Sequence, residues 1–261
     1  MLLHLDNPDE QSPTDQFCGV FLEEITLENA SAHLKAAILI TLTLPVRLAK
    51  RFHRFQPPPL IASIIEVRVL ASDFRRKLQP EEKIVERSGI KAGMSVLELG
   101  CGLGVYTLGL ARAVGNKGKL YALDMQPAMI ERLRRRLEKP EYTEFTNIET
   151  MLANAYELPF TDESIDSVVM VAVLPEIPDK DRALKEIRRI LKPGGILAIS
   201  ETLIDPDYPL RRTTKEYCRR AGFVLLSTSG SFFNYTMQFE FQGHHANQAY
   251  YKSGTMPPRR P

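Results

Sequence analysis

The stretch from Lys91 to Glu201 alternates between short apolar runs and longer amphipathic runs, and this alternation constrains the fold more than any other feature. The apolar runs have the length and composition of β-strands, whereas the amphipathic runs repeat with the period of an α-helix. One run, SIDSVVMVAVL, is apolar almost throughout, as expected for a strand buried on both faces. Repeated strand–helix units predict a parallel sheet covered by helices.

The pattern changes after Tyr208. The string YPLRRTTKEYCRRAG predicts a helix, and GFVLLSTS and NYTMQFEF predict two strands with a short connection between them. That spacing is typical of an antiparallel hairpin added to the edge of the sheet. The expected fold is therefore α/β, with a doubly wound, seven-stranded, Rossmann-like sheet, a C-terminal antiparallel hairpin and a helical N-terminal segment.

The chain divides into three predicted parts. Residues 1–57 form a helical N-terminal segment, residues 58–242 form the sheet domain, and residues 243–261 form a flexible, polar tail. The boundary near residue 57 rests on QPPPL, because consecutive prolines favour an extended linker.

The N-terminal segment contains the uncharged run AAILITLTLPV, which is followed by basic residues. A bilayer span needs about 20 apolar residues, so this run is too short to cross a membrane. Two readings remain open for residues 31–54. They form either a helix that rests on anionic lipid, or a helix that packs on the main domain or on a second subunit.

The composition excludes several classes of protein. The 261 residues are 44% hydrophobic and 25% charged, which is ordinary for a globular domain and unlike a disordered or collagen-like chain. The net charge of +2 gives no reason to expect a nucleic-acid partner. Three cysteines without a C-x-x-C motif predict neither a disulfide framework nor a metal site, and they favour a reducing, cytoplasmic setting.

The segment Val96–Gly104 reads as a buried strand that runs into a glycine-rich turn. Glycines permit positive φ angles and let a ligand approach the backbone closely. A nicotinamide-binding turn needs glycine or alanine at the position of Val105, and a nucleoside-triphosphate loop needs a G-K-S or G-K-T string that is absent. The spacing therefore disfavours both dinucleotides and nucleoside triphosphates.

Asp124 ends the next predicted strand, 20 residues after Gly104. In a doubly wound sheet this carboxylate lies beside the glycine turn, where it can accept hydrogen bonds from a ribose diol. The alternative role is that of the N-cap of the helix that begins at Pro127. Both roles could hold together.

Four strings fall in one order: VLELGCGLG, ALDMQPAMI, ANAYELPFTDESIDSVVMVAVL and ALKEIRRILKPGGILAISE. Together they resemble the class I S-adenosylmethionine-dependent methyltransferases, and most of all the group that includes the ubiquinone/menaquinone C-methyltransferases. The resemblance covers about residues 74–241. It implies S-adenosylmethionine as the cofactor.

The resemblance also implies roles for ten residues. Those around the methionine part of the cofactor are Glu98, Gly100, Cys101, Gly102 and Gly104 of the turn, and Val171 through its backbone. Those around the adenosine are Asp124 at the ribose, Met125 on the adenine face, and Asn154 and Ala155 at the adenine edge. Many relatives have aspartate where this chain has Asn154, and an amide oxygen is the weaker acceptor.

Methyl transfer from a sulfonium needs a base only when the acceptor must lose a proton. The sequence has no histidine between His53 and His244. The candidate bases are therefore Glu201, Asp205, Tyr208 and His53. An acceptor that arrives already ionised would need no base at all.

The resulting prediction is methyl transfer to a small, hydrophobic organic acceptor, with the N-terminal segment as a lid, a contact with the inner face of a membrane, or a contact between subunits. One alternative is a macromolecular acceptor, protein or RNA, although the basic run at residues 132–136 falls on an outer helix. The other is a binding module that retains the cofactor fold without turnover.

Overall fold

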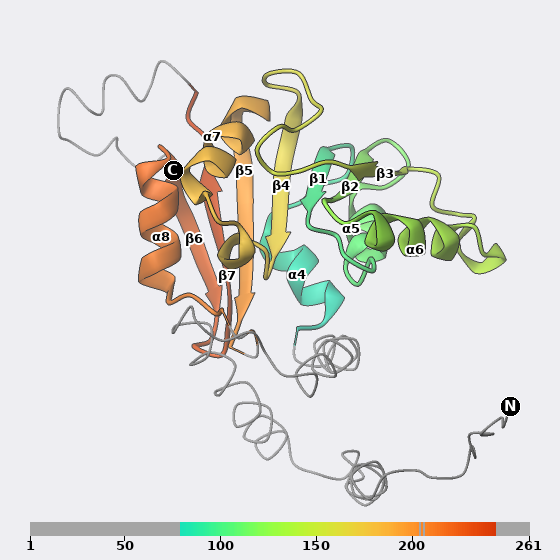
Figure 1. Cartoon of the computed structure of the whole chain (residues 1–261), viewed down its shortest axis with the longest axis horizontal. Helices are drawn as coiled ribbons and strands as arrows, with labels where there is room; N and C mark the ends of the chain where they lie inside the picture. Colours follow the sequence, from blue (N-terminus) through green and yellow to red (C-terminus); the bar gives the residue numbers. More distant parts are fainter. Residues whose placement is uncertain (1–78, 204, 206, 244–261) are drawn as a thin grey trace, which may run out of the picture.

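The seven strands form one sheet in the order β3-β2-β1-β4-β5-β7-β6 (Figure 1). The computed structural model describes residues 79–203, 205 and 207–243. Strands β1 to β5 are parallel to one another, and β7 runs antiparallel to both β5 and β6. The strands are β1 (Ser95–Leu99), β2 (Lys119–Asp124), β3 (Ile148–Leu152), β4 (Ile165–Val171), β5 (Leu191–Thr202), β6 (Val224–Gly230) and β7 (Asn234–Glu240). The predicted parallel sheet and the predicted C-terminal hairpin are both confirmed.

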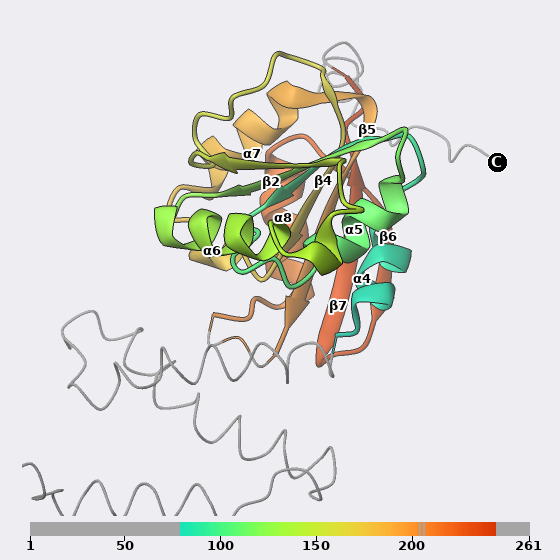
Figure 2. The same ribbon diagram turned by 90° about the vertical axis from the view of Figure 1, so that its right-hand side faces the viewer.

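Helices cover both faces of this sheet, as the doubly wound prediction requires (Figure 2). One face carries α4 (Glu81–Ser88), α5 (Thr107–Val114) and α6 (Pro127–Leu137), and the other carries α7 (Lys180–Ile190) and α8 (Arg211–Arg220). Short 3-10 turns at Pro140–Tyr142 and Leu174–Glu176 complete the described elements.

The core divides between these two faces because side chains alternate along a strand. Val168 belongs to the cluster under α7 and α8, and its neighbour Val169 belongs to the cluster under α4 and α5. Both side chains are fully buried, in agreement with the almost continuous apolar run of β4. The strand is apolar from Val168 to its end because it has a helix layer on each side.

Several predicted features lie outside the described residues. These are the N-terminal segment 1–57, the first residues of the domain at 58–78, His53, the run at 31–54, and the tail from residue 244 onward. Among the helices of the described part, none combines the length and the apolar composition that a bilayer crossing requires.

Candidate cofactor site

The glycine turn follows β1 at the point where the strand order reverses. From β1 the chain moves outward to β2 and β3, and it then returns to place β4 on the other side of β1. In doubly wound sheets a crevice opens at this point, outside the carboxyl ends of the strands. The turn and the residues that end β2, β3 and β4 therefore lie at the edge of the sheet where such a crevice is expected.

The three glycines of the turn all have positive φ, yet they face different surroundings. A Cβ on Gly100 would lie 2.5 Å from Cγ2 of Val173, and a Cβ on Gly104 would lie 2.5 Å from Cδ1 of Leu133. A Cβ on Gly102 would meet no atom within 4 Å. Gly100 and Gly104 are thus required by close packing, whereas Gly102 borders open space that a ligand can enter.

The amides of the turn are already used within the protein. The N–H groups of Gly100 and Cys101 both donate to the carbonyl oxygen of Leu123, at 2.7 and 3.0 Å. The N–H of Gly104 donates to Cys101 O at 2.9 Å, and the N–H of Gly102 donates to Oδ2 of Asp124 at 2.9 Å. Phosphate-binding turns instead aim their N–H groups at the ligand. This turn suits a cofactor that has no phosphate.

Asp124 lies between the glycine turn and the start of α6, and its side chain is 7% exposed. Its Oδ1 accepts from the N–H of Gln126 at 2.9 Å, while Oδ2 holds Gly102. Each carboxylate oxygen retains a second acceptor site, which suits two ribose hydroxyls. The N-cap alternative is wrong, because Gln126 is the N-cap of α6 and no side chain caps that helix.

Glu98 is a buried carboxyl group on β1, directly below the turn. Its Oε2 accepts a hydrogen bond from Oγ1 of Thr107, at 2.6 Å. Burial raises the pKa of Glu98 to about 8, and the negative charges of Glu81 and Asp124 act in the same direction. In the protein without ligand, Glu98 is therefore largely protonated at neutral pH.

Two large apolar side chains are exposed where β2 and β3 end. Met125 follows β2 and is 70% exposed, and Leu152 at the end of β3 is exposed as well. Leu152 pairs in register with Asp124, so both apolar residues neighbour Asp124 at this edge of the sheet. Apolar side chains beside a ribose-binding carboxylate suit the faces of an adenine ring.

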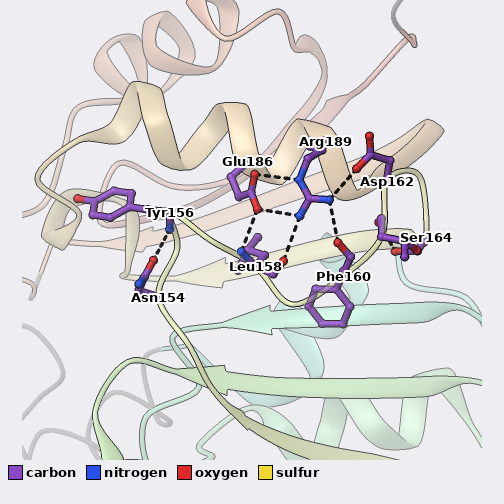
Figure 3. A network of polar contacts seen from close by, with 9 residues as sticks. Asn154, Tyr156, Leu158, Phe160, Asp162, Ser164, Glu186 and Arg189 are labelled. Carbon is purple, nitrogen blue, oxygen red and sulfur yellow. Dashed lines mark hydrogen bonds and ion pairs between the residues drawn. The ribbon is translucent and has the colours of Figure 1, made fainter.

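Asn154 and Ala155 follow β3, and the backbone ties this segment to Asp124. The N–H of Ala153 donates to the carbonyl oxygen of Asp124 at 3.2 Å. Oδ1 of Asn154 accepts from the N–H of Tyr156 at 2.8 Å (Figure 3). That oxygen has one acceptor site left for a ligand, and the amide nitrogen supplies donors.

Val171 ends β4 on the other side of the turn and is partly buried. The next residue, Ala172, has a φ of 56°, which is uncommon for a residue with a Cβ. Its N–H donates to Ser200 O at 2.8 Å, which holds the unusual backbone in place. The chain thus turns sharply at the mouth of the crevice.

Three of the four candidate bases lie close in the sequence, at the end of β5 (Glu201) and in the segment that follows it (Asp205 and Tyr208). Glu201 and Asp205 are buried, and Tyr208 is partly buried beside them in the sequence. The hydroxyl of Tyr208 donates to Phe232 O at 2.5 Å, and burial raises the pKa of Tyr208. Tyr208 therefore keeps its proton at neutral pH and is the least suited of the three to accept one.

Cys101 lies inside the turn and is buried. Burial and the negative charges of Glu98 and Asp124 raise the pKa of its thiol, so the thiolate form is disfavoured. Cys101 therefore contributes its backbone and its packing to the site, rather than a reactive thiolate. In the part of the chain that the structure describes, no group of three or more histidine, cysteine, aspartate or glutamate side chains is placed to hold a metal ion.

Sequence reasoning missed Arg136 of α6, which the structure places against the turn. Its Nη1 donates to the carbonyl oxygens of Gly104 and Leu103, at 2.9 and 3.4 Å. In the sequence it is one member of a basic run, and nothing in that run distinguishes it from its neighbours. Thr107 was also missed, although a hydroxyl just after a glycine turn could have indicated a partner for Glu98.

Comparison with known proteins identifies the family. Residues 90–241, more than half of the chain, match the family described as a methyltransferase domain. The ubiquinone/menaquinone biosynthesis C-methyltransferase UbiE of Hahella chejuensis is 40% identical over 117 residues, which are 45% of this chain and 46% of that protein. The demethylmenaquinone methyltransferase of Geobacillus stearothermophilus is 36% identical over 129 residues, which are 49% and 54% of the two chains.

The chain spans about half the length of these curated relatives. Among solved structures, a SAM-dependent methyltransferase from Aquifex aeolicus superposes with a TM-score of 0.59 at 24% identity, over 64% of this chain and 92% of that one. This likeness confirms the Rossmann-like fold. The chain belongs to the methyltransferase-domain family, and its described part has the fold of a class I S-adenosylmethionine-dependent methyltransferase.

Proposed function

We propose that the protein transfers a methyl group from S-adenosylmethionine to a small hydrophobic acceptor of the quinone class. One observation carries the cofactor part of this proposal. The amides of Gly100, Cys101, Gly102 and Gly104 are bonded within the protein, while Gly102 borders open space and Asp124 retains acceptor sites. This combination suits an adenosyl group without phosphates.

When bound, S-adenosylmethionine supplies a methyl group that is already activated by a positive sulfur. The protein therefore binds and aligns. Asp124 accepts from the ribose hydroxyls, Met125 covers one face of the adenine, and the segment at Asn154 meets its edge. Glu98 and the turn surround the methionine part. The remaining rate acceleration comes from correct alignment of the acceptor and from exclusion of water. Alignment alone lowers the activation barrier by about 7–11 kcal/mol in favourable cases.

The hydrophobic acceptor is supported by an apolar surface after β5. Phe232 and Phe233 at the tip of the β6–β7 hairpin are 60% and 58% exposed, and Leu210 is exposed beside them. Hydrogen bonds from Leu203 N to Phe233 O and from Tyr208 Oη to Phe232 O tie this tip to the segment that follows β5. The names of the two curated relatives point to quinone precursors as the acceptor class.

We place the cofactor domain at residues 58–242 and a covering segment at residues 1–57. Gln79, the first described residue, is buried, and its Nε2 donates to the carbonyl oxygen of Glu201 at 3.4 Å. The chain therefore enters the domain beside the end of β5. A preceding segment that covers this end would exclude water from the acceptor, and residues 31–54 would rest on a membrane surface or on a second subunit.

Glu201 and Asp205 remain the candidate bases for an acceptor that must lose a proton. Both are buried near the apolar surface, whereas the hydroxyl of Tyr208 donates a hydrogen bond to Phe232 O. The proposed location is cytoplasmic, at the inner face of a membrane, because a quinone acceptor dissolves in lipid.

The test uses the full chain with methyl-labelled S-adenosylmethionine and a demethylmenaquinone in detergent micelles. Mass spectrometry then follows the label. Label in the quinone that falls in Asp124→Ala at limiting cofactor concentration supports the proposal. Label that appears only in protein or RNA of an added extract would favour a macromolecular acceptor. Cofactor binding without any labelled product would favour the binding module.

A further inference from the structure

The segment that follows β3 lies along one face of α7 (Figure 3). At the start of the helix, the N–H of Asp179 donates to the hydroxyl of Tyr156 at 3.0 Å, and the guanidinium of Arg182 stacks 4.9 Å from the centre of that ring. One turn further on, Oε1 of Glu186 accepts from the N–H of Leu158 at 2.9 Å. The contacting helix positions are three to four residues apart, so one helix face makes them all.

Arg189 closes the row of contacts and uses all five of its N–H donors. Nη2 donates to Leu158 O at 3.0 Å, and Nη1 donates to Phe160 O at 2.8 Å and to Oδ1 of Asp162 at 2.7 Å. Nε and Nη2 donate to the two carboxylate oxygens of Glu186, at 3.0 and 2.7 Å. Planar, forked donation of this kind holds its acceptors in one geometry.

The charges of this cluster reinforce the contacts. Hydrogen bonding to Arg189 holds the pKa of Glu186 below its usual value, and the bonds to Glu186 and Asp162 raise the pKa of Arg189. Both groups therefore stay ionised through the neutral range. Because Arg189 binds backbone carbonyl oxygens at Leu158 and Phe160, it fixes the path of the chain itself.

The same segment begins at the residues assigned to the adenine edge. Tyr156, held by α7, donates its N–H to Oδ1 of Asn154, and Ala153 donates its N–H to the carbonyl oxygen of Asp124. A continuous series of contacts therefore runs from Glu186 and Arg189, through Leu158 and Tyr156, to Asn154. A shift of the segment along α7 would move Asn154 relative to Asp124.

We infer that Glu186 and Arg189 are positioning residues for the base of the cofactor. They act through residues 154–162 and set the place of the groups that read the adenine edge. The inference rests on the proposed cofactor site and deepens it. A purely structural pair would instead stabilise the domain without affecting which base it accepts.

The test compares two probes that differ only at the adenine edge. These are S-adenosylhomocysteine and S-inosylhomocysteine, in which a carbonyl oxygen replaces the exocyclic amine. Calorimetric titration of the full chain gives the dissociation constant of each. For Arg189→Ala we expect affinity for the adenosyl probe to fall about 5- to 30-fold, with a much smaller change for the inosyl probe. The preference between the two bases should largely disappear.

A matched control exists on α8, outside residues 154–162. There Arg219 donates through Nε and Nη2 to the two oxygens of Glu216, at 3.0 and 2.7 Å, the same spacing and distances as in the pair on α7. Arg219→Ala should leave both dissociation constants unchanged. Arg189→Lys keeps the positive charge but not the fork, so it should restore only part of the preference.

The outcomes separate the inference from the proposed function. An unchanged base preference in folded Arg189→Ala would overturn the inference alone, as would an equal loss of affinity for both probes. If Arg189→Ala does not fold, two other variants give the test. They are Arg189→Lys and the double variant Glu186→Gln with Asp162→Asn. A preference for the adenosyl probe equal to that of wild type, in either variant, would overturn the inference. A wild-type chain that binds neither probe would overturn the proposed cofactor site and this inference with it.

Discussion

Arg136 donates through Nη1 to the carbonyl oxygen of Gly104 at 2.9 Å, and α6 thereby holds the glycine turn from outside the crevice. Leu133, one turn earlier on the same helix, fills the space beside Gly104 that a Cβ would need. The turn is therefore fixed by a charge-assisted hydrogen bond and by an apolar contact, both from α6.

Removal of this contact should weaken both fold and binding. Arg136→Ala should lower the free energy of unfolding by about 1.5–3 kcal/mol, as the loss of a hydrogen bond from a charged donor does. Affinity for S-adenosylhomocysteine should fall as well, because the turn is less well held. The matched control is Arg135→Ala, whose exposed side chain forms an ion pair with Glu131 on the same helix. Urea unfolding and calorimetry measure the two effects, and equal behaviour of the variants would contradict this role.

The glycines of the turn should separate folding from binding. Gly104→Ala places a Cβ 2.5 Å from Leu133 at a positive φ, and it should cost roughly 2–4 kcal/mol of stability. The Cβ of Gly102→Ala would meet no atom within 4 Å, so this variant should lose only about 1 kcal/mol of stability, through backbone strain. We nevertheless expect Gly102→Ala to reduce cofactor affinity more than tenfold, because its Cβ enters the open space. Thermal unfolding and calorimetry should therefore rank the variants in opposite orders, and the same order in both would contradict the assignment.

Asp124 should contribute to cofactor binding as well as accepting hydrogen bonds from two backbone N–H groups. Asp124→Ala should weaken binding of S-adenosylhomocysteine by about 1.5–3 kcal/mol, the range for hydrogen bonds to a charged group. Asp181→Ala is the control. Asp181 forms an exposed ion pair with Arg220, a residue far from Asp181 in the sequence. Unchanged affinity in Asp124→Ala, measured by calorimetry, would remove Asp124 from the site.

Glu98 should make stability depend on pH in a defined direction. The pKa of Glu98 is about 8 in the fold, against about 4.3 for an unfolded chain, so the folded protein holds a proton that the unfolded protein releases. The stabilisation is complete below pH of about 4.3 and is lost as pH rises toward 8, with a slope of at most about 1.4 kcal/mol for each pH unit. Glu98→Gln removes this slope. Urea unfolding at several pH values between 5 and 8 should show wild type losing stability relative to Glu98→Gln, and parallel curves would contradict the raised pKa.

The same carboxyl group gives a signature in binding. The methionine part of S-adenosylmethionine carries an ammonium group, and a cation close to Glu98 favours the carboxylate. Binding at pH 7 should therefore release a proton, which calorimetry detects when it is repeated in buffers of different ionisation enthalpy. Glu98→Gln should bind without this release. A proton release that persists in the variant would assign it to another group.

Much of the architecture could be predicted from the sequence because the local hydrophobic pattern indicates the same helices and strands that the fold contains. The apolar run of β4 and the glycine stop after α5 are local signals, and both correspond to elements of the structure. The role of Asp124 was harder to predict, since the same residue type suits an N-cap and a ribose contact. Only the tertiary structure shows that its two oxygens accept from Gly102 and Gln126 and that Gln126 is the N-cap, which excludes the N-cap role for Asp124.

The contacts that hold the site could not be predicted for a physical reason. Arg136 and Arg189 have the same local surroundings as other arginines near the ends of amphipathic helices, and such side chains usually face water. Their partners are backbone carbonyl oxygens 29 to 33 residues away in the sequence. Carbonyl groups occur at every residue, so the sequence carries no mark of which ones an arginine will reach.

One calorimetric comparison tests the cofactor site that underlies these expectations. The full chain is titrated in a calorimeter with S-adenosylmethionine and, separately, with a nicotinamide dinucleotide, and both titrations are repeated with Asp124→Ala. We expect saturable, one-to-one binding of S-adenosylmethionine that weakens in Asp124→Ala, and no binding of the dinucleotide. Binding of the dinucleotide in preference, or equal binding of S-adenosylmethionine by both proteins, would contradict the assignment.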